Sequence, residues 1–183
     1  MPNRLLEIFQ IPVSRQYHIP SPRTSLNKDT GLALSLYAWA VPVILEAQSA
    51  HTIATQFCLM VGKGAAYLQP TSRILGASLA SLAVLSYTHP DPIQSAKWSY
   101  WAVALACVLP IAPYEVSLIF PINDEILEMR NEMDDRRSAG LANDDKKCDK
   151  YIREQIYKWR RRHVGRIVMP FAAFCLGIAV ISS

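Results

Sequence analysis

The sequence has 183 residues, 51% of them hydrophobic, and a formal net charge of +4. Its charges are concentrated, because residues 124–162 carry 11 basic and 10 acidic side chains. A short segment of mixed sign in an otherwise apolar chain argues against a soluble nucleic-acid-binding protein, which needs a sustained positive surface. The four cysteines show neither CxxC nor zinc-ligand spacing, so they predict thiols and no metal site.

The first 30 residues contain four basic side chains and several prolines. They include no apolar core long enough for a cleavable signal peptide. We therefore expect a flexible segment over residues 1–30, followed by one helical domain over residues 31–183.

Four largely apolar runs follow, close to the length of about 20 residues that a helix needs to cross a bilayer. They cover residues 31–50, 74–90, 98–123 and 167–183. Pro70 predicts a helix break ahead of the second run. A soluble four-helix bundle is the alternative, but the second and fourth runs lack the polar face that it would need. The sequence therefore predicts an all-α fold, an integral membrane four-helix bundle.

Residues 124–162 predict a charged helical hairpin outside the bilayer. Ser138–Ala139–Gly140 is a plausible helix stop, and Asn143–Asp144–Asp145 resembles the cap of a further helix. That last helix would have about 38 residues and a length of about 57 Å, well beyond the bilayer. Its first half should pair with the extension of the third run. The 11 Lys and Arg favour a cytosolic hairpin, whereas the basic residues before residue 31 favour the reverse.

Ionisable residues within apolar runs are candidate functional groups, because they are costly in a bilayer. Glu46 is the first of these, and helical spacing places it on one face with Ser35, Trp39 and Pro42. We expect this face to turn inward and Trp39 and Glu46 to contact a substrate. The alternative is that Glu46 is merely solvated at the end of the helix.

Glu115 follows Tyr114 in a run interrupted by three prolines. Prolines free backbone carbonyls, and irregular backbone at membrane depth is tolerated where it is buried or lines a cavity. Tyr114 and Glu115 are therefore candidate substrate-binding residues. The alternative is a kinked packing helix in which Glu115 pairs with a basic residue such as Arg166 or Lys63.

The spacing of Trp159, His163 and Arg166 places them on one helical face where the fourth run begins. Trp supplies a flat apolar wall, neutral His a base near pH 7, and Arg a permanent cation that can stabilise an oxyanion. Together they could ionise and hold a flat phenolic substrate. The alternative is that Trp and Arg are ordinary anchors at a membrane interface.

In these features the sequence resembles the fungal anthrone oxygenase family, small four-span membrane proteins found with polyketide pathways. The resemblance covers roughly Gly31 to the C-terminus. It rests on Pro42 to Leu45, the spacing from Gly64 to Pro70, Pro113-Tyr114 leading to Pro121-Ile122-Asn123, and Trp159, His163 and Arg166 before an apolar run. Two positions depart from the family pattern, which usually has threonine at the places of Glu115 and Ile122.

The resemblance implies oxidation of an anthrone to an anthraquinone with dioxygen as co-substrate and no metal or flavin, in secondary metabolite biosynthesis. The sequence has no glycine-rich nucleotide loop. As a hypothesis, His163 removes the methylene proton of the anthrone while Arg166 and Asn123 stabilise the enolate oxygen. Trp159 would stack on the rings, and Glu115 would orient Arg166 or relay the proton.

Two other functions stay open. An isomerase or cyclase could use the same base, and a non-catalytic four-span scaffold could bind pathway enzymes through the hairpin. The scaffold predicts that His163 and Arg166 face lipid headgroups, whereas the enzymes need them to face a cavity. We expect a multi-pass protein of an endomembrane such as the endoplasmic reticulum, with a flat aromatic polyketide and the lipid bilayer as partners and no nucleic acid. Small residues at 76, 77 and 80 would permit a homodimer.

Overall fold

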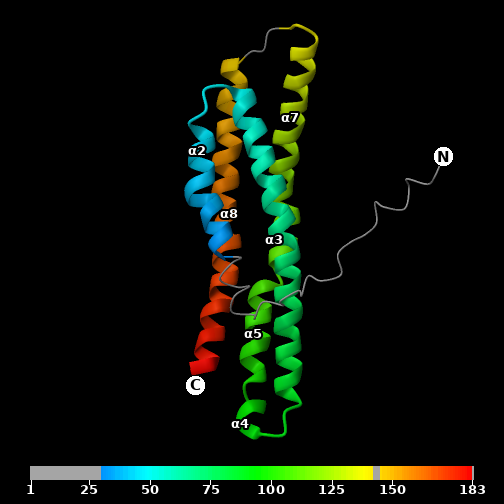
Figure 1. Ribbon diagram of the computed structural model, residues 1–183, viewed down its shortest axis with the longest axis vertical. Coiled ribbons are helices and arrows are strands. Elements are labelled where there is room, and N and C mark those ends of the chain that lie inside the picture. The colour runs from blue at the N-terminus through cyan, green and yellow to red at the C-terminus, as the bar shows by residue number, and fades with distance from the viewer. Residues whose placement is uncertain (1–29, 142–144, 183) are drawn as a thin grey trace, which may run out of the picture.

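The computed structural model describes residues 30–141 and 145–182, and these are entirely helical apart from short links. Four long helical segments lie side by side in an elongated bundle (Figure 1). This confirms the all-α prediction. The expected N-terminal segment lies outside the described residues, except for Thr30, which begins the first helix.

The first helical segment, Thr30–Leu45, is shorter than the predicted run. It contains a π-helical turn, η1 (Leu36–Ala40), and ends with α2 (Val41–Leu45). The prediction that this helix continues to residue 50 is wrong, because it ends at Leu45 and Ser49 is the N-cap of the next helix. The Ser49 hydroxyl accepts a hydrogen bond from the Thr52 backbone N–H at 3.2 Å, which caps that helix at its N-terminus.

Helix α3 (Ala50–Tyr87) runs without interruption for 38 residues, so the predicted break at Pro70 is wrong. The ring of Pro70 lies on the exposed side of the helix, where it displaces no packed neighbour. The hydroxyls of Thr71 and Ser72 donate to backbone carbonyls one turn earlier, at 2.7 and 2.8 Å. Buried leucines on the opposite face hold both halves of α3 against the bundle.

After a turn, the chain returns along α3 as one nearly continuous helical rod. The rod consists of α4 (Pro92–Ser95), α5 (Trp98–Val108), α6 (Ile111–Tyr114), the π-helical turn η2 (Glu115–Ile119) and α7 (Phe120–Ser138). Pro110 and Pro121 stand at the starts of α6 and α7, where a missing N–H is tolerated. Gly140 adopts a φ of 69° directly after the rod, which confirms the predicted stop.

The last helix, α8 (Asp145–Ser182), has 38 residues, as predicted from the sequence. Its first half pairs with α7, as expected for a helical hairpin, while the position of the hairpin outside a bilayer stays a prediction (Figure 1). Asn143 and Asp144 of the expected cap lie outside the described residues. Arg153 of α8 also donates to the carbonyls of Leu45 and Ala47, and this ties the hairpin to the end of α2.

Two apolar clusters form the core, one toward each end of the bundle. The first joins Phe57 of α3 with Ile126 of α7 and Ile156 of α8. The second joins Leu75 of α3 with Ala104 of α5 and Ala173 of α8, among others. The middle of the bundle, between these two levels, contains the buried polar side chains of the described chain.

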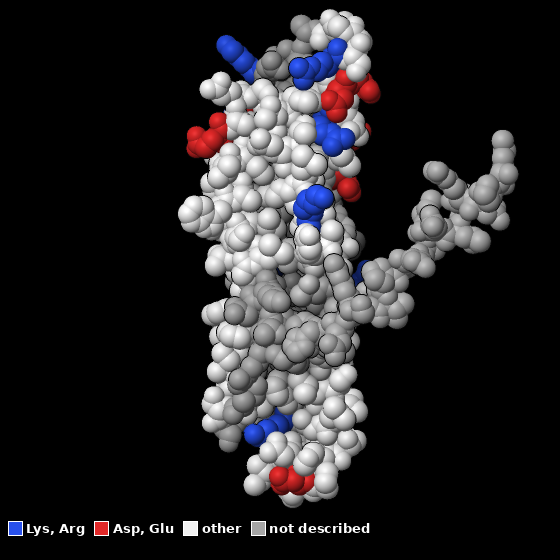
Figure 2. Space-filling model, viewed as in Figure 1, with Lys and Arg blue, Asp and Glu red and all other residues white. Residues whose placement is uncertain are grey.

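Two helices, Pro92–Ser138 and Lys146–Val180, are long and apolar enough to cross a membrane. They correspond to the third and fourth predicted runs, while Thr30–Leu45 is apolar but shorter. On the face shown in Figure 2, charged side chains gather mainly toward the end where α7 and α8 meet. Large apolar side chains elsewhere are more than half exposed, including Tyr67, Val84, Val103 and Phe171. Such surface is typical of contact with a membrane or a partner.

Helix α8 passes unusually close to α6 at Gly165. A Cβ atom at this position would lie 2.6 Å from Cζ of Tyr114, well inside van der Waals contact. The Tyr114 ring cannot easily move away, because its hydroxyl donates to the backbone carbonyl of Arg162. Only glycine therefore permits this approach.

We expect Gly165→Ala to lower the free energy of unfolding by about 1–3 kcal/mol, because the new methyl group overpacks the contact with Tyr114. Gly62→Ala is the matched control, since a Cβ there meets nothing within 4 Å. It should stabilise α3 by about 0.5–1 kcal/mol through helix propensity. Denaturation of both variants in detergent measures the difference, and equal stability would contradict the close approach.

Candidate active site

Trp159, His163 and Arg166 of α8 turn inward at mid-bundle. Their exposed fractions are 3%, 1% and 8%. The helical face predicted from their spacing is therefore buried against α3 and the η2–α7 part of the rod. This burial does not agree with an interface-anchor or scaffold role, both of which require these side chains to reach the headgroup region.

Glu115 meets Arg166 across the interior of the bundle. The carboxylate Oε1 lies 2.6 Å from the guanidinium Nη1, and the two side chains are only 7% and 9% exposed. Glu115 opens the π-helical turn η2, a form of helix that is often found at functional sites. Of the two cations considered as its partner, Arg166 is the one it pairs with, and Lys63 is exposed elsewhere on α3.

Two aromatic rings, those of Trp159 and Phe57, set the orientation of the imidazole. The Trp159 and His163 rings are stacked, with centroids 4.3 Å apart and an interplanar angle of 18°. Phe57 of α3 contacts Trp159 edge-on at 5.4 Å. A face of the Trp159 ring is therefore already occupied by His163, and the indole acts as a support for the imidazole.

A cavity of about 20 Å³ lies between these groups, lined among others by Asn123, Trp159, His163 and Arg166. That volume holds about one water molecule. The structure thus brings together all four residues proposed for proton removal, oxyanion stabilisation and ring stacking.

Polar atoms around this cavity lack hydrogen bonds. Among the described residues, no hydrogen-bond partner is found for Oδ1 of Asn123, Nε1 of Trp159, either ring nitrogen of His163, or Nη2 of Arg166. Each buried group without a partner costs about 1–3 kcal/mol. So many at one place are better explained by a ligand site than by packing.

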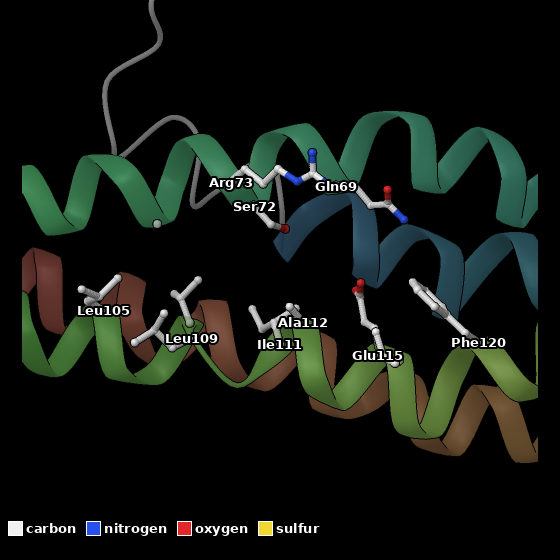
Figure 3. A pocket seen from close by; sticks show the side chains of 12 residues that line it. Gln69, Ser72, Arg73, Leu105, Leu109, Ile111, Ala112, Glu115 and Phe120 are labelled. Atoms are coloured by element: carbon white, nitrogen blue, oxygen red, sulfur yellow. The ribbon is translucent and has the colours of Figure 1, made fainter.

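Larger hollows adjoin this cavity. One of about 400 Å³ lies between α3 and the α5–η2 part of the rod, and Figure 3 shows the Glu115 carboxylate directed toward α3 inside it. Gln69 and Phe120 line both this hollow and the small cavity. A second hollow, of about 240 Å³, shares Asn123 and Phe120 with the cavity. Phe120 therefore stands where all three spaces meet.

Tyr114 and Arg162 brace the rod against α8. The Tyr114 hydroxyl donates to the Arg162 carbonyl, and the Arg162 guanidinium donates to the Leu118 carbonyl at 2.9 Å. The second bond supplies a donor to the irregular backbone of η2, as such a turn requires. Tyr114 thus directly precedes Glu115 of the ion pair in the chain, and its hydroxyl is engaged by backbone.

Trp39 and Glu46 do not reach this site, and the expectation that their face turns inward is wrong. Trp39 is 75% exposed, and Glu46 lies exposed at the end of α2. The other side of the same helix is buried instead, through Ala33, Val41 and Ile44. The small apolar side chains permit closer packing than the indole does, so they face the bundle. Trp39 lines an open hollow of about 560 Å³ on the α3 side.

Gln69 and Phe120 were not predicted as site residues. Gln69 comes from the middle of α3 and Phe120 from the start of α7. The sequence around these two residues does not indicate a functional site, because an isolated amide or aromatic side chain in an apolar run usually contributes only to packing. Only the approach of α3 to the rod places them at the cavity.

The model of the family described as anthrone oxygenase matches residues 57–176, well over half of the chain. The matched range includes every residue that lines the small cavity except Leu36. No curated protein and no solved structure matches the sequence.

The ion pair leads to a stability prediction. We expect Arg166→Leu to cost about 3–5 kcal/mol, because Glu115 is left as an uncompensated buried charge. Adding Glu115→Leu should restore most of this loss, since two apolar side chains replace the pair. Denaturation of both single variants and the double variant in detergent tests the coupling. Simple additivity of the two losses would show that the pair does not interact in the folded protein.

Proposed function

The chain belongs to the anthrone oxygenase family, an enzyme family, and we propose that it oxidises an anthrone-type aromatic polyketide to the anthraquinone with dioxygen. One observation carries the proposal: a base, a cation and an amide converge on a buried cavity with polar atoms left unpaired among the described residues. Those are the groups that enolate formation requires.

His163 is the proposed general base. Burial and the nearby Arg166 guanidinium both oppose a positive charge on the imidazole, so the ring is neutral and able to accept a proton. The stack on Trp159 fixes the plane of the ring. His163 would remove one proton from the methylene carbon that lies opposite the carbonyl of the anthrone. The product is an aromatic enolate, with its negative charge largely on oxygen.

Arg166 and Asn123 are the proposed partners of that oxygen. Glu115 holds Nη1 of Arg166, while Nη2 has no hydrogen bond with the described residues. The amide nitrogen of Asn123 would supply a second donor. Donors that are fixed before the reaction stabilise developing charge without reorganisation, which is their advantage over water.

The substrate itself would supply the electrons for oxygen reduction. The enolate transfers one electron to dioxygen, giving a carbon radical and superoxide, and these combine to form a carbon–oxygen bond. Protonation gives a hydroperoxide at the former methylene carbon. Loss of the remaining proton on that carbon and cleavage of the O–O bond release water and leave the second carbonyl. Anthrone and dioxygen thus become anthraquinone and water, and the proton taken by His163 is returned to the departing oxygen.

A bilayer setting suits such a substrate. The two long apolar helices and the exposed apolar side chains support insertion in a membrane, and we extend this to four spans in an endomembrane. A flat aromatic polyketide partitions into lipid, so it would reach the bundle from within the bilayer. The charged α7–α8 hairpin would then project into water.

His163→Ala is expected to lower kcat for anthrone oxidation by about 10²–10⁴-fold, because proton removal loses its base. The measurement is oxygen uptake by the purified protein in detergent with a simple anthrone, with the spontaneous rate subtracted. Uptake should require no added metal or flavin. Full activity in a folded His163→Ala variant would remove this residue from the base role.

Arg166→Ala is expected to lower kcat by about 10²–10³-fold, as for loss of an oxyanion donor. Arg161→Ala is the matched control, because it removes an exposed arginine of the same helix. Equal losses in both variants would point to a general charge effect. Consumption of substrate without oxygen uptake would instead favour the isomerase or cyclase alternative.

A further inference from the structure

The cavity beside His163 is too small for the proposed substrate. It measures about 20 Å³, whereas pockets for ligands of several rings have volumes of about 300–1,000 Å³. The rings must therefore lie in an adjoining space. The 400 Å³ hollow beside Glu115 is within this range, and it borders the cavity at Gln69 and Phe120.

The two walls of this hollow differ in chemistry. The wall from α5, α6 and η2 is mostly apolar, with Leu105, Ile111 and Val116 among its residues. The α3 wall carries Gln69, Ser72 and Arg73, which Figure 3 shows above the apolar side. Such a space fits a planar aromatic molecule whose oxygen substituents lie along one edge.

Arg73 is unusual on the α3 wall. It is the only Asp, Glu, Lys or Arg between residues 64 and 90, and its side chain is exposed at the rim of the hollow. It forms no ion pair with the described residues, whereas Glu115 in the same hollow is paired with Arg166. A single cation above an apolar floor fits an anionic group on the ligand.

We propose that the 400 Å³ hollow is the chamber that holds the aromatic substrate, and that Arg73 at its rim binds an ionised acidic substituent of that substrate. This inference rests on the proposed function. Phe120 separates the chamber from the small cavity, so a turn of its side chain would bring the rings to His163. Arg73 is here a specificity-determining residue, without part in the chemical steps.

The other hollows fit less well. The 240 Å³ hollow is smaller and carries the Asp124 carboxylate, which forms no ion pair with the described residues, unlike Glu115, and so repels an acidic ligand. The open 560 Å³ hollow has no residue in common with the small cavity. Its cation, Lys63, provides a control for Arg73.

Two glycines of α3 allow each hollow to be filled separately. Gly76 lines the 400 Å³ hollow and Gly62 the 240 Å³ hollow, and an added Cβ meets nothing within 4 Å at either position. Leucine favours helix over glycine, so both variants should fold. We expect Gly76→Leu to weaken binding of anthraquinone-2-carboxylate at least about tenfold, because its side chain occupies the chamber. Gly62→Leu should bind like the wild type, as measured by calorimetry in detergent.

The result of this comparison decides the location. Weaker binding only in Gly76→Leu supports the chamber. Weaker binding only in Gly62→Leu would show that the ligand occupies the smaller hollow. Equal affinities of the two variants would show that neither hollow by itself holds the ligand. Both of these outcomes overturn the proposal.

Arg73→Gln tests the acidic substituent. The wild type should bind anthraquinone-2-carboxylate about fivefold more tightly than the neutral 2-carboxamide, and Arg73→Gln should remove this preference. Lys63→Gln, an equal change of charge on the same helix, should keep it. A preference that survives in Arg73→Gln, or that is lost equally in Lys63→Gln, would overturn the role of Arg73.

Oxygen uptake by the same variants separates this inference from the proposed function. One outcome is that the wild type binds the ligand in a way that depends on Gly76 and Arg73 and yet consumes no oxygen with an anthrone. That result would overturn the proposed oxygenase function but support the proposed binding chamber. Anthrone-dependent oxygen uptake that persists in Gly76→Leu would agree with the proposed function but contradict the proposed binding chamber.

Discussion

The buried ion pair between Glu115 and Arg166 is the constraint on which the centre of the molecule depends. Neither charge is tolerated in an apolar interior without the other, so η2 and α8 must meet at one register. That register in turn brings the stacked rings of Trp159 and His163, which lie one turn apart on α8, beside Asn123. The apolar clusters above and below hold the helices together.

Local backbone features make the pairing feasible. The π-helical turn η2 begins at Glu115, and the Arg162 side chain supplies a donor to one of its carbonyls. Gly165 allows α8 to approach the Tyr114 ring more closely than any other residue would. A close contact between α8 and the Tyr114 ring thus lies next to the polar atoms that lack partners among the described residues. This combination of a rigid frame and unpaired donors is what an oxyanion site requires.

The proposed mechanism assigns chemistry and substrate binding to two separate spaces. The small cavity carries the base and the cation, while the larger hollow offers an apolar wall and Arg73. Glu115 borders the hollow and holds Arg166, so it links the two spaces.

The sequence alone determined the features that depend on local periodicity and turn chemistry. These are the all-α class, the charged hairpin, the 38-residue last helix, the stop at Gly140, and the common face of Trp159, His163 and Arg166. Local rules failed where packing decides. Pro70 sits within a helix because its ring faces outward, and the Trp39 face turns out because smaller side chains pack better inside. The pairing of Glu115 with Arg166, and the meeting of Gln69, Phe120 and Asn123, join residues far apart in the chain, and only the tertiary structure brings such groups together.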